Sequence, residues 1–153
     1  MALTYRLRIK TKIPLLNFVE KYLVENNILF SRESINKGVN IYLNEALGFM
    51  ISVGSFENIF FDYLVSENHS TEEEWDYSND IYFIIDKSYD SLLVRLNMIE
   101  ICSYVLSNTN EDARLLFNGD ILVFERTNGI ITTNKNFGFW NSDDLLDKMK
   151  LIM

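Results

Sequence analysis

The sequence of 153 residues contains one cysteine, one proline and one histidine, and each scarcity excludes a class of structure or mechanism. With Cys102 alone, the chain forms no internal disulfide and no cysteine-rich zinc site, which is typical of proteins in a reducing compartment. His69 is the sole imidazole, so any Ser-His-Asp or Cys-His catalytic system would have to use it. A single proline and six glycines favour regular elements joined by short connections.

Long hydrophobic runs are also missing. No apolar stretch approaches the roughly 18 residues that a membrane-spanning helix requires. Residues 1–10 alternate charged and apolar side chains, unlike the apolar region of a signal peptide. We therefore expect a cytoplasmic protein that does not bind membranes.

Basic residues are absent from the middle of the chain. Residues 38–86 carry ten Asp and Glu residues but no Lys or Arg, and the whole chain has a net charge of −8. Such a segment would repel phosphate backbones, so we expect no nucleic-acid partner. It is compatible with a basic protein partner, because complementary charge raises association rates. It is equally typical of an acidic surface that keeps a cytosolic protein soluble.

The clearest structural signal lies in residues 110–134, where two Asn-Gly pairs separate three apolar runs. Asn118-Gly119 and Asn128-Gly129 favour type I′ turns, because asparagine and glycine tolerate positive φ. This pattern predicts three consecutive antiparallel strands over 113–117, 121–126 and 130–134. Strict alternation predicts a further strand over 3–10. Its polar side chains Arg6, Arg8 and Lys10 are interpreted as the solvent side of a sheet rather than as a ligand-facing stripe.

Helical spacing of apolar residues predicts helices over 14–26 and 91–107, and Ser142 is expected to cap a short C-terminal helix. The helix over 91–107 is apolar around most of its circumference, so we expect it to be covered on more than one side. Short apolar runs predict strands over 28–32, 39–43, 47–53 and 80–85. Residues 57–65 fit neither period, and we favour a short helix over a strand there. Residues 66–79, which are polar and acidic, are interpreted as an exposed loop.

The order of these elements is typical of an α+β fold. We predict that residues 1–153 form a single domain, with a mainly antiparallel sheet of about six to eight strands and helices packed on one face. No internal repeat or linker interrupts the chain.

Residue patterns for catalysis or metal binding are missing from the sequence. Cys102 falls on the apolar stripe of a predicted helix, which indicates an inert core thiol. The acidic cluster at 72–80 lacks the register of a calcium-binding loop, and the glycines form no phosphate-binding loop. A pair of carboxylates for glycosidic chemistry stays open. We expect no enzyme, no cofactor and no metal ion.

One segment has the composition of a protein-binding surface. Aromatic side chains alternate with acidic ones between residues 72 and 80, and aromatic anchors with a charged surround are common in protein interfaces. Trp75 either anchors a partner or folds back onto the body of the protein while the acids are solvated. The candidate binding residues are Glu72, Glu73, Glu74, Trp75, Asp76, Tyr77 and Asp80.

Three stretches resemble one family. These are the opening Met-Ala-Leu-Thr-Tyr-Arg-Leu-Arg, the stretch Glu-Asp-Ala-Arg-Leu-Leu-Phe-Asn-Gly-Asp at 111–120, and Phe139-Trp140 after the last strand. They are similar to the swarming-inhibition (Sit) immunity family of myxobacteria and relatives. Its members begin Met-Ala-Leu-Glu-Tyr and share a Gly-Asp-Ala-x-Leu-Leu-Phe-Asn-Gly-Glu stretch. Thr4, Glu111 and Asp120 depart from these motifs, and the acidic middle matches poorly.

The resemblance implies a cytoplasmic immunity protein that neutralises a toxin delivered by contact between neighbouring bacteria. On this hypothesis the chain binds a cognate toxin domain, such as a basic nuclease, occludes its active site and catalyses nothing itself. An alternative is a small-ligand-binding or enzymatic α+β domain that uses a pocket between sheet and helices. That alternative needs His69 or several buried acids to converge. A scaffold or phage-related interaction protein is a third possibility.

Overall fold

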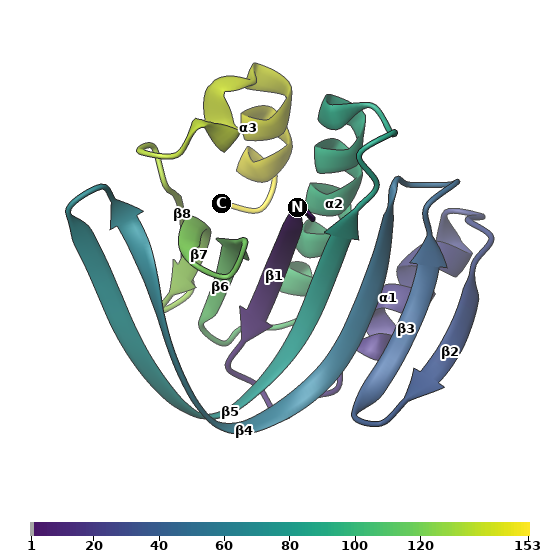
Figure 1. Ribbon diagram of the computed structural model, residues 1–153, viewed down its shortest axis with the longest axis horizontal. Coiled ribbons are helices and arrows are strands. Elements are labelled where there is room, and N and C mark those ends of the chain that lie inside the picture. Colours follow the sequence, from purple (N-terminus) through teal and green to yellow (C-terminus); the bar gives the residue numbers. More distant parts are fainter. Residues whose placement is uncertain (1) are drawn as a thin grey trace.

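A computed structural model describes residues 2–153, which form one eight-stranded sheet and three α-helices (Figure 1). The strands are β1 (Thr4–Ile9), β2 (Ser31–Ile35), β3 (Gly38–Leu43), β4 (Phe49–Ser66), β5 (His69–Ile85), β6 (Ala113–Phe117), β7 (Ile121–Thr127) and β8 (Ile130–Thr133). The helices are α1 (Leu16–Glu25), α2 (Ser91–Ser107) and α3 (Asp143–Lys150), with a 3₁₀ turn η1 (Gly138–Asn141). The predicted α+β class is confirmed.

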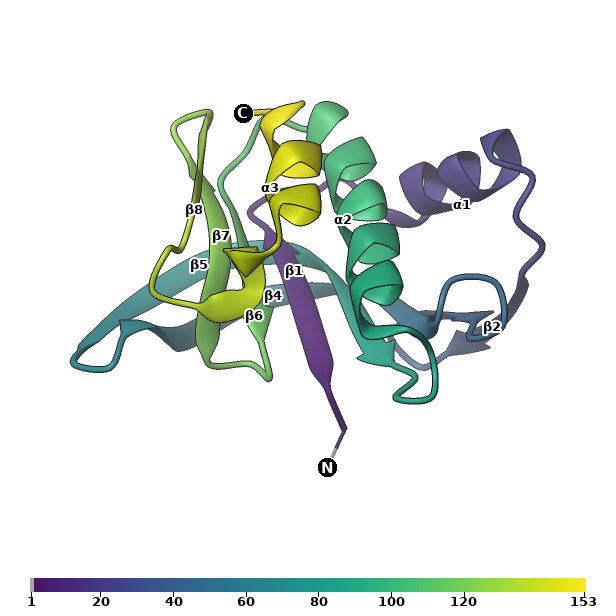
Figure 2. The same cartoon turned by 90° about the horizontal axis from the view of Figure 1, so that it is seen from above.

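The strands follow the order β2-β3-β4-β5-β1-β6-β7-β8, and all neighbours in this order are antiparallel. All three helices lie on one side of the sheet (Figure 2). The core fills the space between them: Leu7 and Ile9 of β1 belong to the same buried cluster as Val19 of α1, Met98 of α2 and Leu145 of α3. Strand β1 therefore buries its apolar face beneath the helices, as its alternation predicted.

Helix α2 is covered on more than one side, as expected from its sequence. It packs against both α1 and α3 as well as the sheet, and Tyr104 places its ring centroid 5.5 Å from that of Tyr22 in α1. Cys102 is fully buried, and burial raises the pKa of its thiol, which leaves it unreactive. None of the helices in residues 2–153 is long and apolar enough to cross a lipid bilayer.

Asp90 and Ser142 stand at the N-cap positions of α2 and α3, where a side chain can accept a hydrogen bond from the first turn of the helix. The Asp90 carboxylate accepts a hydrogen bond from the Leu93 N–H at 2.8 Å, whereas Ser142 at the start of α3 makes no side-chain cap bond. Ser142 thus occupies the predicted cap position of α3 without the predicted contact. We expect Asp90→Ala to lower the free energy of unfolding by about 1 kcal/mol and Ser142→Ala to lower it less. Urea denaturation of both variants measures the difference, and equal losses would contradict it.

The three strands predicted after α2 are confirmed as β6, β7 and β8. Both Asn-Gly pairs have positive φ, with values of 50° and 81° at Asn118-Gly119 and 53° and 81° at Asn128-Gly129. Such values at both central residues are those of the type I′ turns expected in hairpins. The Asn118 side chain also accepts a hydrogen bond from the Thr4 N–H at 3.0 Å, which ties the first turn to β1.

Two predictions for the middle of the chain are wrong. Residues 57–65 are strand rather than helix, and residues 69–79 are strand rather than loop, because both belong to one long hairpin of β4 and β5. Its ladder runs from the Phe49–Ile85 pair to the Ser66–His69 pair. An acidic strand with a solvated outer face resembles a loop in composition, which explains the error. Strand β2 is also displaced, since it starts at Ser31 rather than Ile28.

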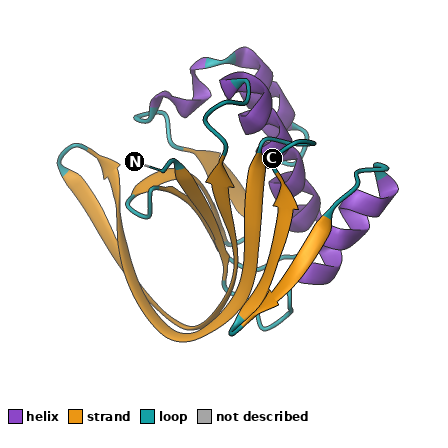
Figure 3. Ribbon diagram, turned by 45° about the vertical axis from the view of Figure 1, so that its right-hand side comes forward, coloured by secondary structure: helices purple, strands orange, loops and turns teal. Residues whose placement is uncertain are grey.

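The β4–β5 hairpin bends back over the sheet face opposite the helices (Figures 1 and 3). Near its tip, Leu64 pairs with Ile121 of β7 in parallel, and the Leu64 N–H donates to Asp120 O at 2.6 Å. Asn134 adds a bond from its side-chain amide to Val65 O at 2.9 Å. Strands β4, β5, β1, β6 and β7 thereby form a closed ring of pairings, and the polar face of β1 lies inside this ring.

Candidate functional site

The interior of the strand ring holds the basic residues of β1. Arg6 and Arg8 each place Nη1 beside Oδ2 of Asp80 in β5, at 3.1 and 3.2 Å, while Lys10 is exposed. Interpreting this stripe as the solvent side of the sheet is therefore wrong for the two arginines. The alternation of β1 was correctly identified, but the hairpin that covers its polar face comes from residues more than forty positions away.

Asp80 is the shared carboxylate of this interior. Burial raises its pKa, while Arg8, the Ser78 hydroxyl and Arg6 oppose that shift. Burial also lowers the pKa of Arg8, whose Nε and Nη1 are buried without a hydrogen bond, although Nη1 is within ion-pairing distance of Asp80. The Arg8 guanidinium lies 4.9 Å from the Phe61 ring centroid. Arg6 and Arg8 thus share the charge of one carboxylate and also contact aromatic rings. These interactions link β1 to the β4–β5 hairpin inside the ring.

A second ion-pair network joins the hairpin to the meander of β6 and β7. Arg114 Nε lies 2.6 Å from Oε2 of Glu73, which also accepts a hydrogen bond from the Tyr63 hydroxyl at 2.7 Å. Arg114 Nη1 further donates to Arg126 O at 2.9 Å. The side chains of Arg114 and Glu73 are only 6% and 17% exposed. Glu73 is therefore a structural ligand of Arg114 rather than a free surface acid.

The hairpin residues that face the ring interior change sides at Asn58. On the side of Asn58 nearest the body of the sheet, Ser78 and Asp80 point inward, whereas beyond it Glu73 and Trp75 do so. Asn58 has a φ of +49°, and the ladder passes from the Glu57–Tyr77 pair to the Ile59–Trp75 pair across it. Both pairs are in the same register, so no residue is inserted there, and the left-handed conformation of Asn58 marks the point at which the two faces exchange.

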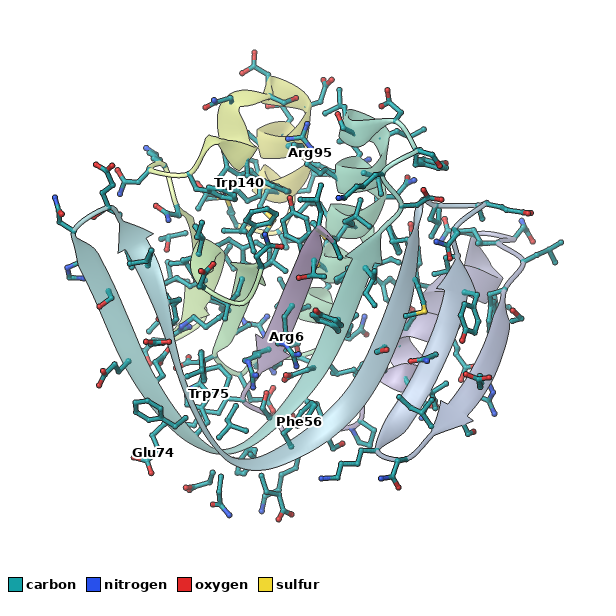
Figure 4. The ribbon with its side chains drawn as sticks, in the orientation of Figure 1. Arg6, Phe56, Glu74, Trp75, Arg95 and Trp140 are labelled. Atoms are coloured by element: carbon teal, nitrogen blue, oxygen red, sulfur yellow. The ribbon has the colours of Figure 1, made fainter. Side chains whose placement is uncertain are left out.

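The structure divides the seven predicted binding residues between two faces. Glu73, Trp75 and Asp80 point into the ring, and Trp75 is 3% exposed with its ring packed edge-on against Phe61 at 5.0 Å. Tyr77 is half-buried, with Lys12 Nζ 5.0 Å from its ring centroid. The exposed residues are Glu72, Glu74 and Asp76. Figure 4 shows Glu74 outside the hairpin and Trp75 inside it.

The outer face of the hairpin gathers acidic and apolar side chains. Phe60 stands opposite Glu74 in the ladder and Asp62 stands opposite Glu72, while Phe60 is 64% exposed and Leu64 38% exposed. We call this surface the outer hairpin face; it comprises Phe60, Asp62, Leu64, Glu72, Glu74 and Asp76. Sequence reasoning missed its β4 members because residues 57–65 were interpreted as a helix. Phe60, Asp62 and Leu64 are spaced two residues apart, and this spacing indicates that they share one face of a strand.

The position of His69 does not favour a catalytic role. It lies exposed at the start of β5, at the tip of the hairpin. Within residues 2–153, no three His, Cys, Asp or Glu side chains are grouped closely enough to hold a metal ion. The polar interior of the ring is occupied by its own ion pairs, so the outer hairpin face is the more accessible of the two surfaces.

Comparison with known proteins identifies the family. A family model described as SitI3-like matches residues 3–144, which include both the opening strand motif and the stretch around the first Asn-Gly turn. Searches of curated proteins and of solved structures returned no match. The family name is that of an immunity protein from a toxin–immunity system, which implies a cognate toxin as partner. The chain belongs to the SitI3-like family.

Proposed function

We propose that this protein binds a cognate toxin domain through the outer hairpin face and blocks the toxin's active site without catalysis of its own. Membership of the SitI3-like family supports the class of function. The location of the contact is supported by the geometry of β4 and β5, which project one exposed face away from the helices (Figure 4).

The main support for this binding location is that exposed apolar and acidic side chains occur together on one regular surface. Phe60 and Leu64 are large apolar side chains exposed on the same face of β4, and exposed apolar surface rimmed by polar residues marks interaction sites. Asp62, Glu72 and Glu74 surround them in register, as a polar rim surrounds an interface anchor. No Lys or Arg occurs between residues 38 and 86.

The charge of the outer hairpin face favours a basic partner. Toxins that cleave nucleic acids carry basic surfaces around their active sites because they bind phosphate backbones. An acidic protein that covers such a surface would be steered to it electrostatically and would exclude the substrate. We therefore propose a basic nuclease domain as the partner.

The test is co-expression with the toxin encoded next to this protein, followed by co-purification and measurement of affinity. We expect the triple variant Glu72→Lys, Glu74→Lys and Asp76→Lys to bind about 10- to 100-fold more weakly than the wild type. Glu73 is left unchanged because it holds Arg114. A matched control, Glu25→Lys, Glu45→Lys and Asp147→Lys, makes the same change in net charge on exposed sites outside the hairpin.

Three outcomes would count against the proposal, and they are distinguishable. Failure of the wild-type proteins to co-purify, together with lack of protection, would reject the immunity function with this toxin. Unchanged affinity of the folded triple variant, with co-purification intact, would reject the outer hairpin face alone. Equal weakening by the control variant would show that net charge rather than this surface determines binding.

A further inference from the structure

A pocket of about 430 Å³ lies between the sheet and the first turns of α2, away from the hairpin tip. Its apolar lining includes Tyr5 of β1, Ile85 of β5, Val94 of α2 and Phe117 of β6. The volume is within the range of about 300–1,000 Å³ that is typical of small-molecule sites. Such an apolar hollow on the edge of the core has room for a compact organic group.

Tyr5 brings a polar atom to this pocket. The residue is 7% exposed, its ring packs against Phe117 at 5.0 Å and Phe139 at 5.7 Å, and it lines the hollow. Among the described residues, its hydroxyl forms no hydrogen bond, and it is not one of the buried atoms that lack a partner, so it stays accessible to water. A ligand atom in the pocket would replace that water as its partner.

Two cations stand at the same pocket without acidic partners. Arg95 of α2 and Lys87, which precedes α2, both line it. The ion pairs within 4.0 Å among residues 2–153 involve neither of them. Arg95 uses Nε to donate to Ser91 O at 2.9 Å, which leaves its terminal nitrogens available. Asp86 also lines the pocket; the Ser88 N–H and hydroxyl donate to its carboxylate and lower its pKa, so one anion stands beside the two cations.

We propose that this pocket binds a small organic carboxylate with an apolar body. The body packs on Ile85, Val94 and Phe117, and the carboxylate pairs with Arg95 and Lys87 while accepting a hydrogen bond from Tyr5. A planar guanidinium is well suited to a carboxylate because it offers parallel donors. The site does not overlap the outer hairpin face, so the proposal is independent of toxin binding.

The test uses 4-phenylbutyrate as the probe and the neutral 4-phenyl-1-butanol as its matched control, both measured by calorimetric titration at pH 7. We expect the carboxylate to bind at least about 10-fold more tightly, which corresponds to about 1.4 kcal/mol. Arg95→Gln is expected to reduce the affinity for 4-phenylbutyrate to that of the alcohol. Arg32→Gln, which alters an exposed arginine of β2, is expected to leave it unchanged.

Amide chemical-shift mapping on the same samples locates the probe. Shifts around Tyr5, Ile85 and Val94 would support the proposal, as would loss of affinity in Lys87→Gln, an exposed substitution that keeps the fold. Equal affinities for acid and alcohol would overturn it, as would absence of binding to the wild type at millimolar concentration. So would shifts confined to another surface, or tight binding by folded Arg95→Gln or Lys87→Gln.

Discussion

Replacement of Arg114 by Ala is expected to lower the free energy of unfolding by about 3–5 kcal/mol, because it leaves a largely buried carboxylate without its cation. Arg114 Nε lies 2.6 Å from Glu73 Oε2 and donates a hydrogen bond to the Tyr63 hydroxyl at 3.1 Å, so both side chains would lose a partner. The substitution also removes the bond to Arg126 O that crosses from β6 to β7. Closure of the strand ring would then rest on the Leu64–Ile121 pairing and on the Asn134 amide.

Urea denaturation monitored by circular dichroism measures this loss. Arg32→Ala is the control, because Arg32 pairs with Glu20 at 2.9 Å on an exposed surface, where such pairs contribute about 0–1 kcal/mol. The double variant Arg114→Ala with Glu73→Ala should recover part of the loss, since no unpaired carboxylate remains. A loss below that of Arg32→Ala would show that the network does not hold the ring closed.

Trp75→Ala is expected to cost a similar amount, about 3–5 kcal/mol, because it removes a large aromatic side chain from a closed interior. Trp75 is 3% exposed, packs against Phe61 and lies beneath the Arg114 guanidinium, 5.8 Å from its ring centroid. The resulting cavity would sit between the hairpin and the meander, where few other apolar groups can fill it.

Phe60→Ala is the matched control, because Phe60 is an aromatic residue of the same hairpin that points outward and is 64% exposed. We expect it to change stability by about 0.5 kcal/mol or less while weakening toxin binding. The two variants therefore separate the structural face of the hairpin from the proposed binding face. Equal losses of stability would mean that the exchange of faces at Asn58 is wrongly placed.

Local patterns in the sequence determined much of the fold. The paired Asn-Gly turns predicted the meander of β6, β7 and β8 because positive φ is a property of the turn residues themselves. The alternation of residues 3–10 predicted β1, and the apolar spacing of residues 91–107 predicted a helix covered on several sides. Each of these signals lies within a few residues of the structure that it describes.

Local sequence patterns did not predict the β4–β5 hairpin. Its two strands stabilise each other through a ladder of cross-strand pairs, and its outer half contacts β6 and β7. None of these partners is visible in the local composition, so residues 57–65, which fit neither period, were interpreted as a helix and residues 66–79 as a loop. Strand formation depends more on cross-strand neighbours than on intrinsic preference, which explains why this segment was misassigned.

The candidate site was likewise predicted in part from the sequence and in part only from the structure. The sequence by itself determined that the middle of the chain is acidic, that Trp75 lies among acids, and that the family motifs occur toward both ends. Only the tertiary structure decided that Glu73 and Trp75 face Arg114 inside the ring while Glu72, Glu74 and Phe60 face outward. The physical reason is that alternation assigns residues to two faces, but packing against distant strands decides which face is buried.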